Sequence, residues 1–482
     1  MRALLLRFAA VRGAFATRLT WREGPRWLRW LPVVLLCSAV GSCATLPDVQ
    51  QLGNTLTPAA APTVNGAHGP LSDDHALTLL RKRWPRNTLD LQAAAALEEA
   101  ATGVPLIAGN KCTLLYDGPQ TMAAMSAAIA AATDHINLET YIFEQDALGR
   151  QFADLLIERQ RQGITVNILY DSVGTLDVPD AFFERMRAAG IHLVAFNPVN
   201  PARLHGDDWR INNRDHRKLL IVDGKVAFTG GLNISGSYSR SSLFRSRPPA
   251  DAAQLGWRDT EVRVEGPAVA AFQWVFLRTW SGQDAADLPD AHYFPPPVRA
   301  GDKIVRVLAS DPGGKFEIYK AYNLAIQQAR RSIHLTSAYF VPDPQTVAAL
   351  AAAARRGVDV RIVVPGKTDL GLVLYAGRAS YEDLLAAGVH IHAMKQAILH
   401  AKTAVIDGTW STVGSTNIDT RSFLHNSELN VVVLGDSFGA EMESAFREDL
   451  RDSIEITPQA WRARPLGERL REWLARIMAY WL

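Results

Sequence analysis

Two spacings of apolar residues alternate along the chain, one typical of strands and one typical of helices. Over residues 135–189 the order is a strand-length apolar run, a helical pattern, a second run and a second helical pattern, at 135–143, 148–162, 164–170 and 179–189. The near-continuous apolar runs at 218–222 and 404–406 are typical of strands buried on both faces. The pattern predicts an α/β fold, with a mixed sheet that carries helices on both faces.

The second half of the chain repeats the first. Arg161-Gln-Gly-Ile-Thr-Val is echoed by Arg355-Arg-Gly-Val-Asp-Val, and Ala188-Ala-Gly-Ile-His by Ala386-Ala-Gly-Val-His, each at an offset of about 195 residues. We therefore predict a tandem duplication of one α/β unit. Two such units are expected to pack about a pseudo-two-fold axis, which is the common self-complementary arrangement.

The N-terminus has the composition of a targeting segment. Residues 1–30 hold seven arginines and a single acid, and an apolar stretch at 30–40 is followed by Gly41-Ser42-Cys43. This order predicts a secretory signal, whose apolar part is short for a membrane span. Val40-Gly-Ser-Cys43 resembles the lipobox of bacterial lipoproteins, which implies lipidation of Cys43 and anchoring at the extracytoplasmic side of the membrane. An uncleaved signal anchor and a buried helix remain alternatives.

Composition narrows the classes of protein further. A chain of 482 residues, of which 48% are apolar, can bury a large core, and this excludes global disorder. Its net charge of +2 is too small to indicate a nucleic-acid-binding protein. Removal of the signal before Cys43 also removes Cys37. Once Cys43 is lipidated, only Cys112 remains, in a string typical of strand core, so no internal disulfide is expected. We predict these regions: signal or anchor 1–43, linker and helical extension 44–105, repeats 106–290 and 300–456, and a C-terminal helix 457–482.

Two matching polar signatures carry the candidate chemistry. They read His216-Arg-Lys218-Leu-Leu-Ile-Val-Asp223 with Gly230-Gly231-Leu-Asn233, and His400-Ala-Lys402-Thr-Ala-Val-Ile-Asp407 with Gly414-Ser415-Thr-Asn417. Histidine and lysine two residues apart on a strand point to the same face, and the small residues let the returning chain bring the asparagine beside them. Two such sets facing each other suit one tetrahedral phosphoryl group.

The paired motifs resemble the phospholipase D superfamily, and the neighbouring strings resemble its bacterial cardiolipin synthase branch. The similarity runs from about residue 110 to 455 and includes Trp257-Arg-Asp-Thr-Glu-Val-Arg and Ser415-Thr-Asn-Ile-Asp-Thr-Arg-Ser-Phe423. The resemblance implies phosphoryl transfer through a phosphohistidine, with no metal or other cofactor. It makes His216 the nucleophile and His400 the general acid and base, an order that the internal symmetry leaves open.

The same resemblance assigns supporting residues. Lys218, Lys402, Asn233 and Asn417 would hold the phosphate oxygens. Asp223 and Asp407 complete the catalytic motifs and are expected to brace the site rather than touch phosphate. Glu428, 28 residues after His400, would orient a histidine, and Glu261 is its expected counterpart despite the insertion at 235–256 that lengthens its spacing from His216.

The C-terminal segment 461–482 has five arginines against two glutamates. Helical spacing places an apolar and aromatic stripe on one side: Leu470, Trp473, Leu474, Ile477, Met478 and Trp481. The pattern predicts a helix that associates with the membrane surface, and the alternative is a helix docked on the core.

The expected reaction is transfer of a phosphatidyl group from one phosphatidylglycerol to another, which yields cardiolipin and glycerol. Phospholipid substrates and a membrane surface are the expected partners, and nucleic acid is not. Three alternatives stay open: a phospholipase D that uses water as acceptor, a phosphodiesterase or nuclease with the same site, and a lipid-binding tether without activity.

Overall fold

The computed structural model describes residues 45–83, 90–199, 210, 212–239, 256–283, 286–368 and 370–477. The expectations for residues 1–43, including lipidation of Cys43, lie outside this part, as do Met478, Trp481 and most of the insertion at 235–256. Leu46–Leu482 form one compact unit. Within the described residues, no helix combines the length and the apolar character needed to cross a bilayer.

The first half contains a seven-stranded sheet. Its order is β3 (Leu106–Leu115), β11 (Glu261–Glu265), β9 (Val226–Gly230), β8 (Leu219–Val222), β4 (His135–Thr140), β5 (Thr165–Asp171) and β6 (His192–Phe196). β4, β5 and β6 are parallel, and the other neighbours are antiparallel.

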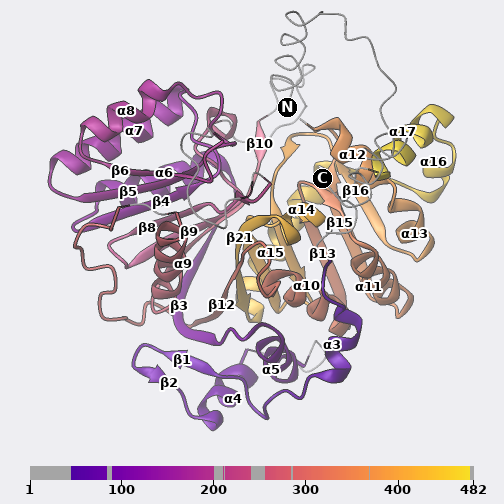
Figure 1. Cartoon of the computed structure of the whole chain (residues 1–482). Helices are drawn as coiled ribbons and strands as arrows, with labels where there is room; N and C mark the ends of the chain where they lie inside the picture. Colours follow the sequence, from indigo (N-terminus) through magenta and orange to yellow (C-terminus); the bar gives the residue numbers. More distant parts are fainter. Residues whose placement is uncertain are drawn as a thin grey trace, which may run out of the picture. The chain divides into compact units, whose positions relative to one another are not determined.

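The second half has the same strand order and the same directions. It runs β12 (Lys303–Ser310), β21 (Asn426–Leu434), β19 (Trp410–Gly414), β18 (Lys402–Ile406), β13 (Ser332–Ser337), β15 (Asp359–Pro365) and β16 (His390–Met394), followed by β22 (Ser453–Glu455). β3 and β12 pair antiparallel and join the halves into one mixed sheet (Figure 1). The predicted duplication of an α/β unit is confirmed.

Both faces of the sheet are buried, as the apolar runs predict. In β8, Leu219 and Ile221 join the core between the two halves, whereas Leu220 and Val222 join the core under the helices of the first half. Alternate side chains of a strand point to opposite faces, so a strand with two packed faces is apolar throughout. The outer helices of the first half are α6 (Gly118–Ala130), α7 (Ala147–Arg161) and α8 (Asp180–Ala188), and α9 (Val269–Ser281) belongs to the central core.

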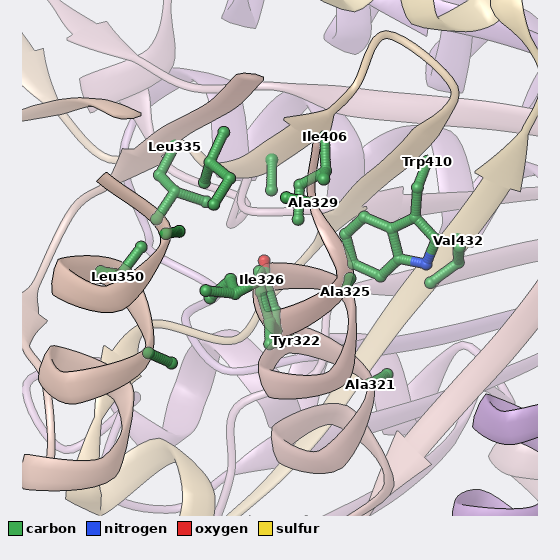
Figure 2. Close-up of a cluster of buried hydrophobic side chains, with 14 of the residues drawn as sticks. Ala321, Tyr322, Ala325, Ile326, Ala329, Leu335, Leu350, Ile406, Trp410 and Val432 are labelled. Carbon is green, nitrogen blue, oxygen red and sulfur yellow. The ribbon is translucent and has the colours of Figure 1, made fainter. Parts of the chain in front are cut away.

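The second half is covered in the same way. α10 (Glu317–Gln328) packs Tyr322 and Ile326 against Trp410 and Leu335 of the sheet (Figure 2). The other helices of this half are α11 (Pro344–Arg355), α12 (Gly371–Arg378), α13 (Tyr381–Ala386), α14 (Thr420–Leu424), α15 (Asp436–Arg451), α16 (Pro458–Arg462) and α17 (Leu466–Ile477). Short strands also pair across loops, β10 (Trp257–Arg258) with β17 (Ile398–Leu399) and β14 (Phe340–Val341) with β20 (Ile418–Asp419).

The N-terminal extension differs from the predicted linker. It folds into α3 (Val49–Thr55), β1 (Val64–Gly66), β2 (Gly69–Pro70), α4 (Asp73–Arg81) and α5 (Leu91–Thr102). Val49 and Val64 are buried in the core of the second half, and the backbone N–H of Val49 donates to Gln345 Oε1 at 2.9 Å. The many prolines and glycines here therefore mark turns of a docked segment rather than a free tether.

Candidate active site

A cavity of about 220 Å³ opens between the two halves of the molecule. Its wall contains both motif histidines and both motif asparagines, His216, His400, Asn233 and Asn417. The sequence-derived expectation that the two signatures share one crevice therefore agrees with the structure. Two aromatic rings also line the wall, one just after β4 and one just after β13. The Tyr141 ring lies 5.1 Å from the His216 ring and the Tyr339 ring 6.3 Å from the His400 ring, measured between centroids.

His216 is held by a carboxylate of the other half. Its Nδ1 lies 3.0 Å and 3.1 Å from the two carboxylate oxygens of Glu428, in β21. Glu428 in turn accepts hydrogen bonds from the Ser415 hydroxyl and from the Asn426 amide. When Nδ1–H donates to the carboxylate, the neutral ring keeps an unprotonated Nε2, which is the form of a nucleophile.

His400 has the reciprocal arrangement. Its Nδ1 lies 2.7 Å from the Asp259 carboxylate, which belongs to the first half, and 3.1 Å from the Tyr238 hydroxyl. The ring also contacts Trp257, with 4.8 Å between the centroids. Each histidine is therefore oriented by a carboxylate from the opposite half, and neither half carries a complete site.

The Glu261 expectation is wrong in its contact, and strand register explains why. Glu261 pairs with Gly230 between β11 and β9, whereas in the second half Gly414 pairs with Asn430. Glu261 is thus the equivalent of Asn430, and the residue equivalent to Glu428 lies two positions earlier, at Asp259. Glu261 instead accepts from the backbone N–H of Leu232, and burial raises its pKa well above the usual range.

Asp259 and Tyr238 are the functional residues that sequence reasoning missed. Asp259 lies in the string Trp257-Arg-Asp-Thr-Glu, two residues before Glu261, and the pairing of β11 with β9 is what identifies it as the equivalent of Glu428. A Cβ atom added to Gly231 would lie 2.1 Å from the Asp259 carboxylate, so this position requires glycine for the close approach. Nothing in the spacing of Tyr238, at the end of a short 3₁₀ helix, marked it in advance.

Burial and mutual repulsion set the protonation of the pocket. Burial lowers the pKa of His216 to about 4, against the opposing attraction of Glu428. Burial and the Lys402 ammonium lower the pKa of His400 to about 4. The pKa of Lys218 falls to about 7 because the ammonium is buried close to Lys402, although Glu428 favours its charged form. Burial thus disfavours the cationic forms of these groups, and a bound anion would offset that effect and favour their protonation.

The asparagines line the pocket, and both lysines are buried beside the motif histidines. Lys218 and Lys402 each donate from Nζ to the backbone carbonyl of the histidine two residues earlier. Asn233 Oδ1 accepts from the backbone N–H of Ile142, and its Nδ2 donates to Tyr238. Asn417 Oδ1 receives no hydrogen bond from the described residues. The site thus offers ammonium and amide donors to one anionic group, as the paired signatures indicate.

Asp223 and Asp407 lie at the far ends of their strands and outside the pocket wall. The Asp407 carboxylate accepts from the backbone N–H groups of Arg330, Arg331 and Ser332, just before β13. Asp223 does the same for Thr133, Asp134 and His135, before β4. Four strand residues lie between each lysine and its aspartate, so the two are five residue steps apart, about 16 Å along the strand. Their inclusion among the catalytic residues is therefore corrected to the bracing role.

With this geometry established, comparison with known proteins identifies the family. A family model described as "Cardiolipin synthase, PLD-like domain" matches residues 125–243 and 323–450. The cardiolipin synthase of Geobacillus kaustophilus (strain HTA426) is 35% identical over 378 residues, which cover 78% of this chain and 73% of that protein. This chain belongs to the phospholipase D-like cardiolipin synthase family.

A second curated cardiolipin synthase and a solved structure are also similar to this chain. The major cardiolipin synthase ClsA of Bacillus subtilis (strain 168) is 33% identical, over 77% of this chain and 75% of that protein. Among solved structures, the phosphatidylserine synthase of Haemophilus influenzae Rd KW20 matches with a TM-score of 0.61 and 12% identity, over 80% of this chain and 99% of that one. This last likeness supports the fold.

Because Asp259 holds His400 and Glu261 does not, substitution of these two acids is expected to change the turnover rate to very different extents. Asp259→Asn places an amide donor against His400 Nδ1, which forces the proton to Nε2, and the turnover rate is expected to fall about 10³-fold or more. Glu261→Gln keeps the size of the side chain and an oxygen that can still accept from the backbone N–H of Leu232, so the rate is expected to change less than about tenfold. Both rates are measured on variants with unchanged melting temperature, and equal losses in the two would contradict the assignment.

The bracing role predicts a loss of stability without a loss of substrate affinity. Asp407→Ala leaves three backbone N–H groups without their acceptor, and the free energy of unfolding is expected to fall by about 2–4 kcal/mol. Denaturant titration measures the loss, with Asp290→Ala, at an exposed position, as the control. A stable variant whose KM alone rises would show that the carboxylate belongs to the binding site.

Proposed function

We propose that this chain is a cardiolipin synthase that transfers a phosphatidyl group between two molecules of phosphatidylglycerol. The observation that carries the proposal is the single pocket in which each motif histidine is held by a carboxylate of the other half. The family relatives named cardiolipin synthase support the reaction class.

In the first step, Nε2 of His216 attacks the phosphorus of a phosphatidylglycerol. The bond between phosphorus and the glycerol oxygen breaks, and His400 gives its proton to that oxygen, so that glycerol leaves. Lys218, Asn233 and their counterparts in the second half donate to the non-bridging oxygens, whose charge grows as the fifth bond forms. Asp259 and Glu428 stabilise the cationic imidazoles and keep their orientation.

In the second step, the headgroup hydroxyl of another phosphatidylglycerol replaces glycerol. His400 takes the hydroxyl proton, the oxygen attacks the phosphorus, and the bond to His216 breaks. Cardiolipin is released, and both rings return to their starting protonation. Water in place of this hydroxyl would give phosphatidic acid instead.

Product analysis tests the proposal. The full chain incubated with phosphatidylglycerol vesicles is expected to form cardiolipin and glycerol in equal amounts, resolved by mass spectrometry. His216→Ala and His400→Ala should lower the rate at least about 10³-fold, whereas His390→Ala, at an exposed histidine, should not. Phosphatidic acid as sole lipid product would assign a phospholipase D, and DNA cleavage without lipid turnover would assign a nuclease.

The pKa values predict the pH dependence. The pKa of His400 is about 4 and that of Lys218 about 7, so rising pH removes protons that the first step requires. Burial also places the pKa of Asp419, in the pocket wall, at about 7, so its ionisation adds negative charge over the same range. We expect kcat/KM to fall as pH rises from about 5 to 9.

kcat should also fall as pH rises, but at a higher pH than kcat/KM does. The reason is that the phosphate of a bound substrate stabilises the protonated groups and so raises their pKa values. Below about pH 4 both parameters should fall as His216 gains a proton. Initial rates across the pH range give both profiles, and flat profiles from pH 5 to 9 would contradict the two-histidine mechanism.

A further inference from the structure

Helix α17 is attached to the rest of the molecule by its polar side. Its buried residues are Glu472 and Ala475. Glu472 forms ion pairs with Arg378 and Arg464, both at 3.0 Å, and Arg378 also pairs with Glu468 at 2.7 Å. An amphipathic helix of a globular protein ordinarily turns its apolar side to the core, and this arrangement is reversed in α17. The docked helix considered above is therefore present, but its apolar side remains uncovered by the described residues.

The side of α17 that faces away from the body is apolar. Five large side chains form it, with exposed fractions between 51% and 79%: Leu466, Leu470, Trp473, Leu474 and Ile477. A group of large apolar side chains on one exposed helix face marks an interaction surface.

The apolar surface continues to the mouth of the catalytic pocket. α17 packs against α12, as Figure 1 shows, and Leu370 and Leu372 at the start of α12 are 40% and 38% exposed. Leu370 also lines the pocket. We call the five residues of α17 together with Leu370 and Leu372 the apolar rim.

The charges on α17 indicate which kind of partner covers its apolar side. Arg469, Arg471 and Arg476 are exposed beside the apolar side chains. Both acids of the helix, Glu468 and Glu472, are instead paired with Arg378. An apolar face flanked by arginines complements an anionic lipid surface.

The size of the pocket also favours contact with a lipid membrane. Its volume of about 220 Å³ is below the roughly 300–1,000 Å³ that holds a drug-sized ligand. A phospholipid is larger than such a ligand, so the pocket has room for the phosphate and headgroup while two acyl chains stay outside it. The apolar rim is the described surface that adjoins the pocket mouth.

We propose that the apolar rim inserts into the interface of an anionic phospholipid membrane and holds the pocket mouth against the lipid surface. The proposal rests on the proposed function for the identity of the lipid that enters the pocket. Substrate then needs to lift only its headgroup phosphate, and the acyl chains remain in the bilayer throughout the transfer.

Photo-crosslinking tests the contact without requiring turnover. The full chain is bound to vesicles of phosphatidylcholine and phosphatidylglycerol that carry a trace of phosphatidylcholine with a diazirine in its acyl chain. After irradiation, lipid adducts are expected on peptides that contain residues 466–477 and 370–372. Adducts are not expected on α9, although its Trp274 is 61% exposed. Adducts confined to residues 1–44 would overturn the proposal, whether or not the chain turns over phosphatidylglycerol.

A matched pair of variants tests the consequence for activity. Trp473→Ser combined with Leu474→Ser should lower the rate on phosphatidylglycerol vesicles at least about tenfold. The rate on short-chain phosphatidylglycerol, dissolved below its critical micelle concentration, should change less than about twofold. Trp274→Ser removes an equally exposed tryptophan outside the apolar rim and should change neither rate.

Three outcomes would contradict the proposal: an unchanged rate on vesicles, equal losses on both forms of substrate, or dissociation of a wild-type dimer into monomers on substitution of the rim. The last outcome, measured by analytical ultracentrifugation, would assign the apolar rim to a second copy of the chain. If the wild-type chain turns over neither form of lipid, the proposed function fails, while the crosslinks still decide the membrane contact.

Discussion

The exchange of carboxylates between the two halves is the interaction on which the site depends. Glu428 reaches His216 and Asp259 reaches His400, so each imidazole is fixed only when the halves are assembled. The pairing of β3 with β12 and the apolar core between the sheets supply that assembly. The same contacts bury both rings and both lysines, which lowers the pKa of His216, His400 and Lys218 and prepares the pocket for an anion.

Most of the fold could be predicted from the residues because its signals are local. The apolar run at 218–222 and the repeated Gly-[Ile/Val] strings mark strands and their order, and the structure has them as β8 and the starts of β5 and β15. The histidines, lysines and asparagines could also be found, since the spacing of two residues on a strand fixes which face they share. The docking of residues 46–83 and 90–105 could not be predicted, because a valine that packs on a distant helix cannot be told from a valine of a tether by the sequence around it.

The missed residues share one physical cause. The partner of His400 depends on which residue of β11 lies opposite Gly230, and register between distant strands is not written in the spacing of either strand. Glu261 was chosen for its side chain, whereas Asp259 occupies the equivalent position. Likewise, the sequence predicts that α17 is an amphipathic helix with an apolar stripe. Which side of this helix packs on the rest of the protein depends on its ion pairs with Arg378, which is distant in the sequence.

Because both halves belong to one chain, the surroundings of the two histidines can differ. In a dimer of identical chains, a two-fold axis would make those surroundings the same. Here the shorter acid, Asp259, approaches over a glycine, Gly231, while the longer one, Glu428, is met by the hydroxyl of Ser415. The Tyr238 hydroxyl also contacts His400, the histidine that Asp259 holds. The two imidazoles therefore sit in chemically distinct surroundings, and a reaction that asks one ring to attack and the other to shuttle a proton begins with that division of labour already built into the covalent chain.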